Sequence, residues 1–171
     1  MSFRRIAILM DTKRLVIRLL GLLVAVLFLS GATAQAAVYS FNLDPPNKAE
    51  DESGNVIRVT GAGVFDTVSH AVRATGSFTI FNSAGAVTGR GIWRATGFDG
   101  FDSFGGPSPG FQGGVLDITV TLFFQGGAPM TDVPMSITCL VNAPPGFTED
   151  EGTTVGDFME KKGGNTLFNL H

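Results

Sequence analysis

The sequence has few of the side chains on which most active sites depend. Its 171 residues include one cysteine, Cys139, and two histidines, His70 and His171. A single thiol cannot form an internal disulfide, so the fold must be stabilised by its core. So few histidines and cysteines argue against a zinc or copper site. We therefore expect no metal and no cofactor.

A helical pattern is also missing beyond residue 36. Nowhere do apolar residues recur at i, i+3 and i+4 for three turns. The sequence instead contains short runs in which apolar and polar residues alternate, with turn residues between the runs. The sequence therefore predicts an all-β protein.

The N-terminal segment has the pattern of a secretory signal peptide. An apolar core, residues 19–30, follows five basic residues and precedes the small residues Ala34 and Ala36. The core is too short for a membrane anchor, so cleavage after Ala36 is expected. Met10 would give a more compact signal and is an alternative start. We predict a signal peptide over residues 1–36, one domain over residues 37–171, no membrane span after cleavage, and a secreted or periplasmic location.

The exported part of the chain is acidic. Five of the twelve Lys and Arg and one of the fifteen Asp and Glu precede residue 37, so residues 37–171 carry seven basic and fourteen acidic side chains, a net charge of −7. An acidic protein is a poor binder of nucleic acids and of anionic membranes. The composition thus excludes nucleic acid as an expected partner.

Residues 56–98 hold three successive strand-like runs with short hairpin connectors. One side of each run is apolar or glycine and the other is polar, as in half-buried antiparallel strands. The apolar side combines five glycines with Phe65, Phe78 and Trp93. Glycine on the inner face of a coiled sheet leaves room for a ring on the next strand.

Further strands are predicted outside this stretch. They cover residues 38–43, 115–124 and 133–141, with a closing hairpin formed by 153–158 and 166–170. Residues 44–55, with Pro45 and Pro46, have the pattern of an acidic loop. Residues 97–114, rich in glycine and phenylalanine, are predicted to be a long loop with a short strand inside.

Together these runs predict a small antiparallel β-barrel, an up-and-down meander of about eight strands after a cleaved signal helix. Its strand count and glycine pattern resemble the architecture of lipocalins and of the allene-oxide-cyclase and dirigent barrels. That resemblance concerns the fold and implies no function and no site residues.

Most groups that could carry chemistry have an ordinary structural interpretation. Cys139 lies among apolar residues of a predicted strand, where a buried thiol is inert. His70 lies in a predicted turn, and its neighbour Ser69 does not make it part of a catalytic triad. The acidic clusters at 50–52, 99–102 and 149–151 lack the calcium-loop pattern and are predicted to be solvated loop charge.

Four of the seven basic residues after position 36 share the polar side of the central strands: Arg58, Arg73, Arg90 and Arg94. They are consistent with an ordinary soluble outer face, with a patch that recognises anions, or with the polar lining of an inverted barrel. The sequence leaves these three interpretations open.

The segment 97–114 is the predicted ligand-binding region. It follows Trp93 and carries Phe98, Phe101, Phe104 and Phe111. These side chains are suited to binding an apolar ligand or partner. Alternatively, they are ordinary core residues that close one end of the barrel. We expect an exported, non-catalytic barrel that binds a small apolar ligand or a protein partner through its loop-bearing end. The alternatives are a cyclase or isomerase with a preorganised pocket, and a structural envelope or extracellular protein.

Overall fold

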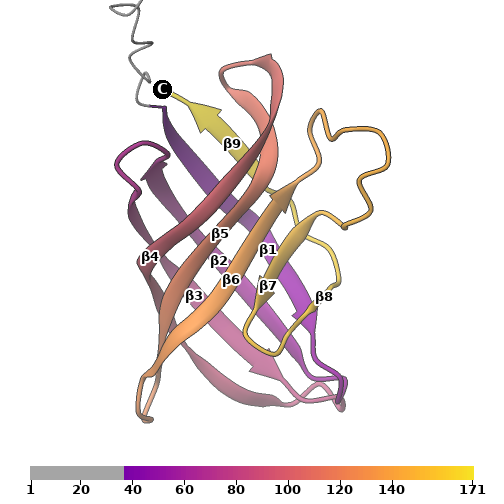
Figure 1. Cartoon of the computed structure of the whole chain (residues 1–171). Coiled ribbons are helices and arrows are strands. Elements are labelled where there is room, and N and C mark those ends of the chain that lie inside the picture. Colours follow the sequence, from indigo (N-terminus) through magenta and orange to yellow (C-terminus); the bar gives the residue numbers. More distant parts are fainter. Residues whose placement is uncertain (1–36) are drawn as a thin grey trace, which may run out of the picture. The chain divides into compact units, whose positions relative to one another are not determined.

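The computed structural model describes residues 37–171, which form one antiparallel sheet (Figure 1). The predicted signal peptide, its cleavage after Ala36 and the choice between Met1 and Met10 lie outside the described residues. The strands are β1 (Val38–Glu50), β2 (Val56–Asp66), β3 (Ala71–Phe81), β4 (Val87–Ser108), β5 (Phe111–Phe124), β6 (Met130–Cys139), β7 (Gly152–Val155), β8 (Glu160–Lys161) and β9 (Leu167–Leu170).

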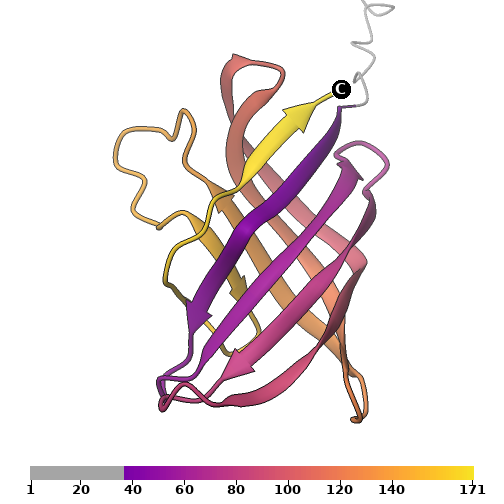
Figure 2. The ribbon, with the colours of Figure 1, turned by 180° about the vertical axis from the view of Figure 1, so that it is seen from behind.

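The sheet closes on itself into a ring of six strands. Its order is β4-β3-β2-β1-β9-β5, and β5 pairs in turn with β4. Strands β1 to β4 follow one another as a meander on the side seen in Figure 2. Strands β6 and β7 extend the sheet from β5, and β8 pairs with β1. The all-β prediction, with an antiparallel meander of about eight strands, is confirmed.

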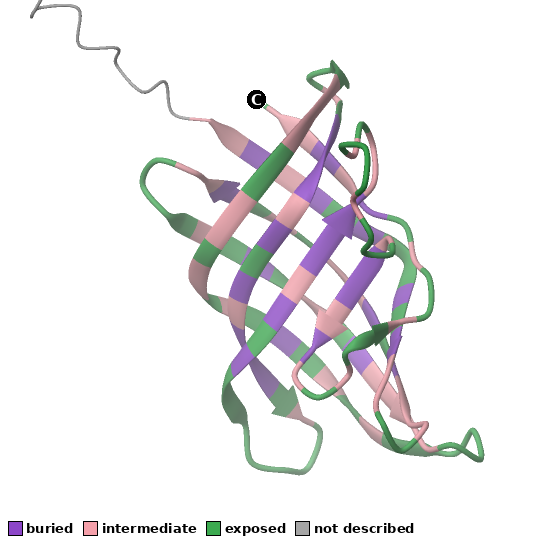
Figure 3. Ribbon diagram, turned by 45° about the vertical axis from the view of Figure 1, so that its right-hand side comes forward, coloured by how far each residue is buried: buried purple, intermediate pink, exposed green. Residues whose placement is uncertain are grey.

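The apolar side of the strands faces the interior, as the alternating burial along the strands shows (Figure 3). Phe65, Phe78 and Trp93 are buried, whereas all four arginines of the central strands are exposed. Exposure of such large aromatic rings to water is unfavourable, so the burial of this side of the strands makes the main contribution to the stability of the fold. The polar lining of an inverted ring is therefore excluded for these strands.

The glycines of the inner face make room for an indole ring, as their pattern predicts. Gly61, Gly76 and Trp93 are partners in register on three neighbouring strands. A Cβ added to Gly76 would lie 1.8 Å from the Thr60 carbonyl oxygen and 2.5 Å from the indole nitrogen. The indole N–H donates to the Thr60 carbonyl at 2.9 Å, so the ring is fixed above the two glycines.

Strand β1 continues through the predicted acidic loop, which corrects the boundary at Leu43. The pairing of β1 with β2 jumps from Leu43–Gly61 to Asn47–Val59, so three residues of β1 oppose one of β2. Pro45 and Pro46 lie in this bulge, where the ladder does not need their missing N–H groups. Only residues 51–55 remain as a turn.

The predicted loop 97–114 is instead a long hairpin of β4 and β5. Its pairing shifts register four times between Ala95 and Ser108, and each shift accommodates unmatched residues. Such bulges break the two-residue alternation from which a strand is recognised. The glycines and the irregular pattern therefore indicated a loop where the chain forms strands.

The predicted closing hairpin is also wrong, because its two halves pair with other strands. β7 pairs with β6, and β9 pairs with β1 and with Gln112 of β5. Buried Asn47 links these regions: its amide nitrogen donates to Thr153 Oγ1 at 2.8 Å and Thr166 Oγ1 at 3.1 Å, while its Oδ1 accepts from the Asn165 N–H at 2.9 Å. These contacts join chain segments far apart in sequence.

Candidate binding surface

The outer side of β2 to β5 carries the four predicted arginines, three of them near one another, while Arg73 pairs with Val64 farther along β3. Arg58, Thr79 and Arg90 are partners in register across β2, β3 and β4, and Arg94 lies two outward positions beyond Arg90 on β4. Neighbouring strands lie about 5 Å apart, and four residues of a strand span about 13 Å. The backbone positions of Arg58 and Arg90 are therefore about 10 Å apart across the sheet, and those of Arg90 and Arg94 about 13 Å apart along β4.

Two of the arginines lie over aromatic rings. The Arg58 guanidinium lies 4.6 Å from the centre of the Phe81 ring, and that of Arg94 lies 5.9 Å from the centre of the Phe123 ring. A cation over a ring face at an exposed site gains about 0.5–1 kcal/mol. The rings thus hold the arginine side chains against the sheet while the edges of the guanidinium groups remain available to a partner.

These arginines are not neutralised by nearby carboxylates within the described part of the chain. The ion pairs between residues 37 and 171 involve Lys161 and Lys162, and none includes an arginine. Strands β2 to β5 carry four arginines and four aspartates, Asp66, Asp99, Asp102 and Asp117, so they are balanced in charge as a whole. The positive part of the outer side is the portion that holds Arg58, Arg90 and Arg94.

Beside the arginines of β4 lies an exposed apolar pair. Ile92 is 48% exposed and Phe123 is 39% exposed, and the two are partners in register on β4 and β5. A shallow groove runs beside them, and its lining comprises Ser77, Phe78, Thr79, Arg90, Gly91, Ile92, Phe123 and Gln125. We call the surface formed by Arg58, Phe81, Arg90, Ile92, Arg94 and Phe123 the arginine face.

Ile92 and Phe123 were missed by reasoning from sequence. Both lie at outward positions of strands whose other outward residues are mostly polar. Each is therefore an apolar residue at a position where the alternation predicts a polar one. That break in the pattern was the available signal. Their pairing in space depends on the β4–β5 register, which the bulges of the hairpin conceal.

The residues predicted to bind a ligand do not gather at one pocket in the described structure. Trp93 is 1% exposed, and Phe101 packs with Tyr39, Phe65 and Phe168 at ring distances of 4.8–5.1 Å. Phe98 stacks between Phe65 and His70, and Phe104 packs on Phe147. Phe111 alone among these five is largely exposed, at 54%. Ligand binding by this set stays a prediction.

The interior beside Trp93 is filled. The space between Ile57, Val59, Phe78, Trp93 and Leu122 is too small to admit a water molecule. Every buried polar side-chain atom described has a hydrogen-bond partner. The centre of the ring therefore offers no chamber for a small molecule at this level of the structure.

Cys139 lies in the apolar core of the protein. It is fully buried on β6, and burial raises the pKa of its thiol above the ordinary value of about 9. A thiol is nucleophilic only as a thiolate, so the structure keeps this group inert near neutral pH.

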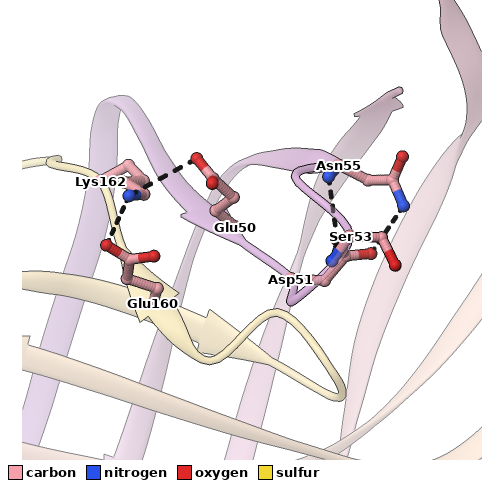
Figure 4. Close-up of polar contacts among 6 residues, drawn as sticks. All are labelled: Glu50, Asp51, Ser53, Asn55, Glu160 and Lys162. Carbon is pink, nitrogen blue, oxygen red and sulfur yellow. Dashed lines mark hydrogen bonds and ion pairs between the residues drawn. The ribbon is translucent and has the colours of Figure 1, made fainter. Parts of the chain in front are cut away.

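The acidic clusters form contacts within the protein. Hydrogen bonds from Asn55 and Ser53 to the Asp51 carboxylate close the β1–β2 turn, and the bond from the Asn55 side chain contributes most to lowering the pKa of Asp51 (Figure 4). Lys162 bridges Glu50 and Glu160, and the hydrogen bond with Glu160 raises the pKa of Lys162. No group of three His, Cys, Asp or Glu within residues 37–171 is arranged to hold a metal ion.

The acidic segment 149–151 is also bound to its surroundings. The Lys161 ammonium, which is largely buried, donates to Glu149 at 2.9 Å and to Thr138 Oγ1 at 2.7 Å. Glu151 accepts from the Thr166 N–H at 3.2 Å. These contacts fasten the long β6–β7 connection to β6 and β8.

Comparison with known proteins adds no relative. No protein-family model matches the chain, and neither a curated protein nor a solved structure shows significant similarity to it. No helix in residues 37–171 is long and apolar enough to cross a membrane. The class of the protein is therefore set by its fold, an all-β antiparallel sheet closed into a six-stranded ring.

Proposed function

We propose that this chain is an exported, non-catalytic β-barrel that binds a protein partner on the outer side of β2 to β5. The observation that carries the proposal is the arginine face, where exposed Ile92 lies between Arg90 and Arg94 and exposed Phe123 lies beside it on β5, and where the arginines form no ion pair among the described residues. Exposed apolar residues rimmed by charge are typical of protein interaction sites.

The packed interior supports an outer site over an inner one. Lipocalin-like binding needs an open lumen, whereas here aromatic and aliphatic side chains fill the space around Trp93. Arginine and aromatic residues are also enriched where proteins bind proteins. A small apolar ligand at the loop-bearing end has less support, because Phe98, Phe101 and Phe104 already pack on other rings.

A non-catalytic role is supported by how the reactive groups are used. The thiol of Cys139 is buried and its pKa is raised, and His70 stacks on Phe98.

The export part of the proposal rests on the sequence of residues 1–36. Sequencing the N-terminus of the mature protein tests it: Ala37 is the expected first residue, and an intact Met1 or Met10 start would contradict it.

Photo-crosslinking in the native culture tests the binding surface. A photoreactive p-benzoylphenylalanine replaces Phe123 in one preparation and Phe111 in another. Both are exposed phenylalanines of β5, one on the arginine face and one at the loop-bearing end. We expect a discrete adduct with another protein from position 123 only.

Three results would contradict the proposed function. The first is an adduct from position 111 alone, which would move the site to the loop-bearing end. The second is equal labelling at both positions, which would indicate contacts without a defined surface. The third, observed by native mass spectrometry of the protein purified from its own culture medium, is a small apolar molecule that leaves only on unfolding.

A further inference from the structure

The outward residues of β4 present a spaced pattern of charge and apolar surface. Arg90, Ile92 and Arg94 alternate with inward-facing residues, so the sequence places a cation, an apolar side chain and a second cation in line. The span from Arg90 to Arg94 is about 13 Å for an extended strand.

An extended polypeptide segment has the same spacing. Its residues i, i+2 and i+4 point to one side and span about 13 Å, so two carboxylates could reach the two arginines while an apolar residue between them meets Ile92. Phe123, in register with Ile92, widens the apolar centre, and the groove beside Ser77 and Thr79 provides a place for the segment to lie.

Charge complementarity selects an acidic occupant. The described arginines lack ion-pair partners within residues 37–171, and a guanidinium binds a carboxylate through two parallel N–H donors. The remaining surface is rich in carboxylates, with fourteen acidic against seven basic side chains from residue 37 onward. A long polyanion would meet this negative surface beyond the patch, whereas a short acidic segment would not.

From this arrangement we infer that the arginine face binds an extended acidic segment of a partner protein with the pattern acidic–any–apolar–any–acidic. This inference rests on the proposed function and names the chemistry of the partner. Arg90 and Arg94 bind the carboxylates, Ile92 and Phe123 contact the apolar residue, and Phe123 holds Arg94 in place through the contact of its ring with the guanidinium.

Titration with synthetic peptides tests the inference without knowledge of the natural partner. The probe is acetyl-Glu-Ala-Leu-Ala-Glu-amide, and its control is acetyl-Leu-Glu-Glu-Ala-Ala-amide, which has the same composition without the spacing. The purified full chain is titrated by calorimetry at low ionic strength. We expect binding in the micromolar to millimolar range, weakened about tenfold by shuffling and further by added salt.

Protein variants identify the binding residues. Arg90→Glu should weaken binding of the spaced peptide about tenfold, because attraction is replaced by repulsion. Arg73→Glu is the matched control: it makes the same charge change on β3, four residues from the groove residue Ser77, and should leave the affinity within about twofold. If Arg90→Glu does not fold, a peptide with Lys in place of Glu serves instead and should not bind the unchanged protein.

Equal weakening by Arg73→Glu and Arg90→Glu would overturn the inference, because it would indicate general charge attraction. Equal affinity for the spaced and shuffled peptides, or no binding of the spaced peptide at 1 mM, would also overturn it. So would self-association that Arg90→Glu abolishes, since the occupant would then be a second copy. An adduct from position 123 together with absent peptide binding would leave the proposed function standing and reject only the acidic segment.

Discussion

The two sides of β2 to β5 differ in what their side chains contact. The inner side packs Phe65, Phe78 and Trp93 against neighbouring strands, with glycines where the indole needs space. The outer side holds arginines over single rings and leaves Ile92 and Phe123 in water. The inner side therefore determines stability, while the outer side contributes little to folding and is free to take part in recognition.

The largest effect is expected from a charge placed on the inner side. Val120 lies in the middle of β5 and is completely buried. Val120→Glu would bury a carboxylate without a partner, at a cost of several kcal/mol against a total stability of about 5–15 kcal/mol for a domain. The variant should be unfolded by circular dichroism. A folded variant would show that the inner side is less tightly packed than described.

The next effect concerns the glycines beneath Trp93. Gly76→Ala would place a methyl group against the Thr60 carbonyl and the indole nitrogen, so strands β2 and β3 must move apart. We expect a loss of about 3 kcal/mol in urea unfolding. Gly85→Ala, in the exposed β3–β4 turn, has open space around its Cβ but a φ of +80°, and should cost only about 1 kcal/mol. Equal losses would contradict the packing of Trp93.

A polar residue of the interior gives an intermediate effect. Asn47→Ala removes three hydrogen bonds that join β1 to the β7 and β9 regions and leaves buried hydroxyl groups without a partner. The free energy of unfolding should fall by about 2–3 kcal/mol. Ser40→Ala, which loses one exposed hydrogen bond to His171, is the control and should change stability by less than about 0.5 kcal/mol. An Asn47→Ala protein as stable as the control would show that this linkage is not required.

The smallest effect on stability is expected on the arginine face. Phe123→Thr removes an exposed ring and its contact with Arg94, which should cost less than about 1 kcal/mol. The same change should nevertheless weaken binding of the acidic peptide severalfold. A large loss of stability would show that Phe123 belongs to the core and would remove the contrast between the two sides.

Much of this fold could be predicted because the central strands alternate regularly. The pattern around Trp93 correctly assigned the strands over residues 56–98, their apolar inner side and the need for glycine. The predictions failed where bulges disturb the alternation, at Pro45 and throughout the β4–β5 hairpin. The pairing of β9 with β1 could not be predicted, because it joins Tyr39 to Leu170 across almost the whole described chain and depends on how the ring closes. The pairing of β7 with β6 is local in sequence, but it gives β7 a different partner from the one that the predicted hairpin assigned.

The candidate binding surface could be predicted only in part. The shared side of Arg58, Arg73, Arg90 and Arg94 follows from alternation alone, and the structure places all four on the exposed side. The position of Phe123 beside Ile92 depends on register and was not accessible. The composition of the Phe-rich segment predicted a ligand site, but three of its four phenylalanines pack on aromatic rings elsewhere in the chain.

The most direct test of the division between a packed inner side and a binding outer side is an NMR titration of the ¹⁵N-labelled protein with the spaced acidic peptide. We predict that the amide signals of Arg90, Ile92, Arg94 and Phe123 shift together with one dissociation constant, while those of Phe104 and Phe111 at the loop-bearing end stay unchanged. Shifts confined to the loop-bearing end, or spread over β6 and β7 as well, would contradict the account.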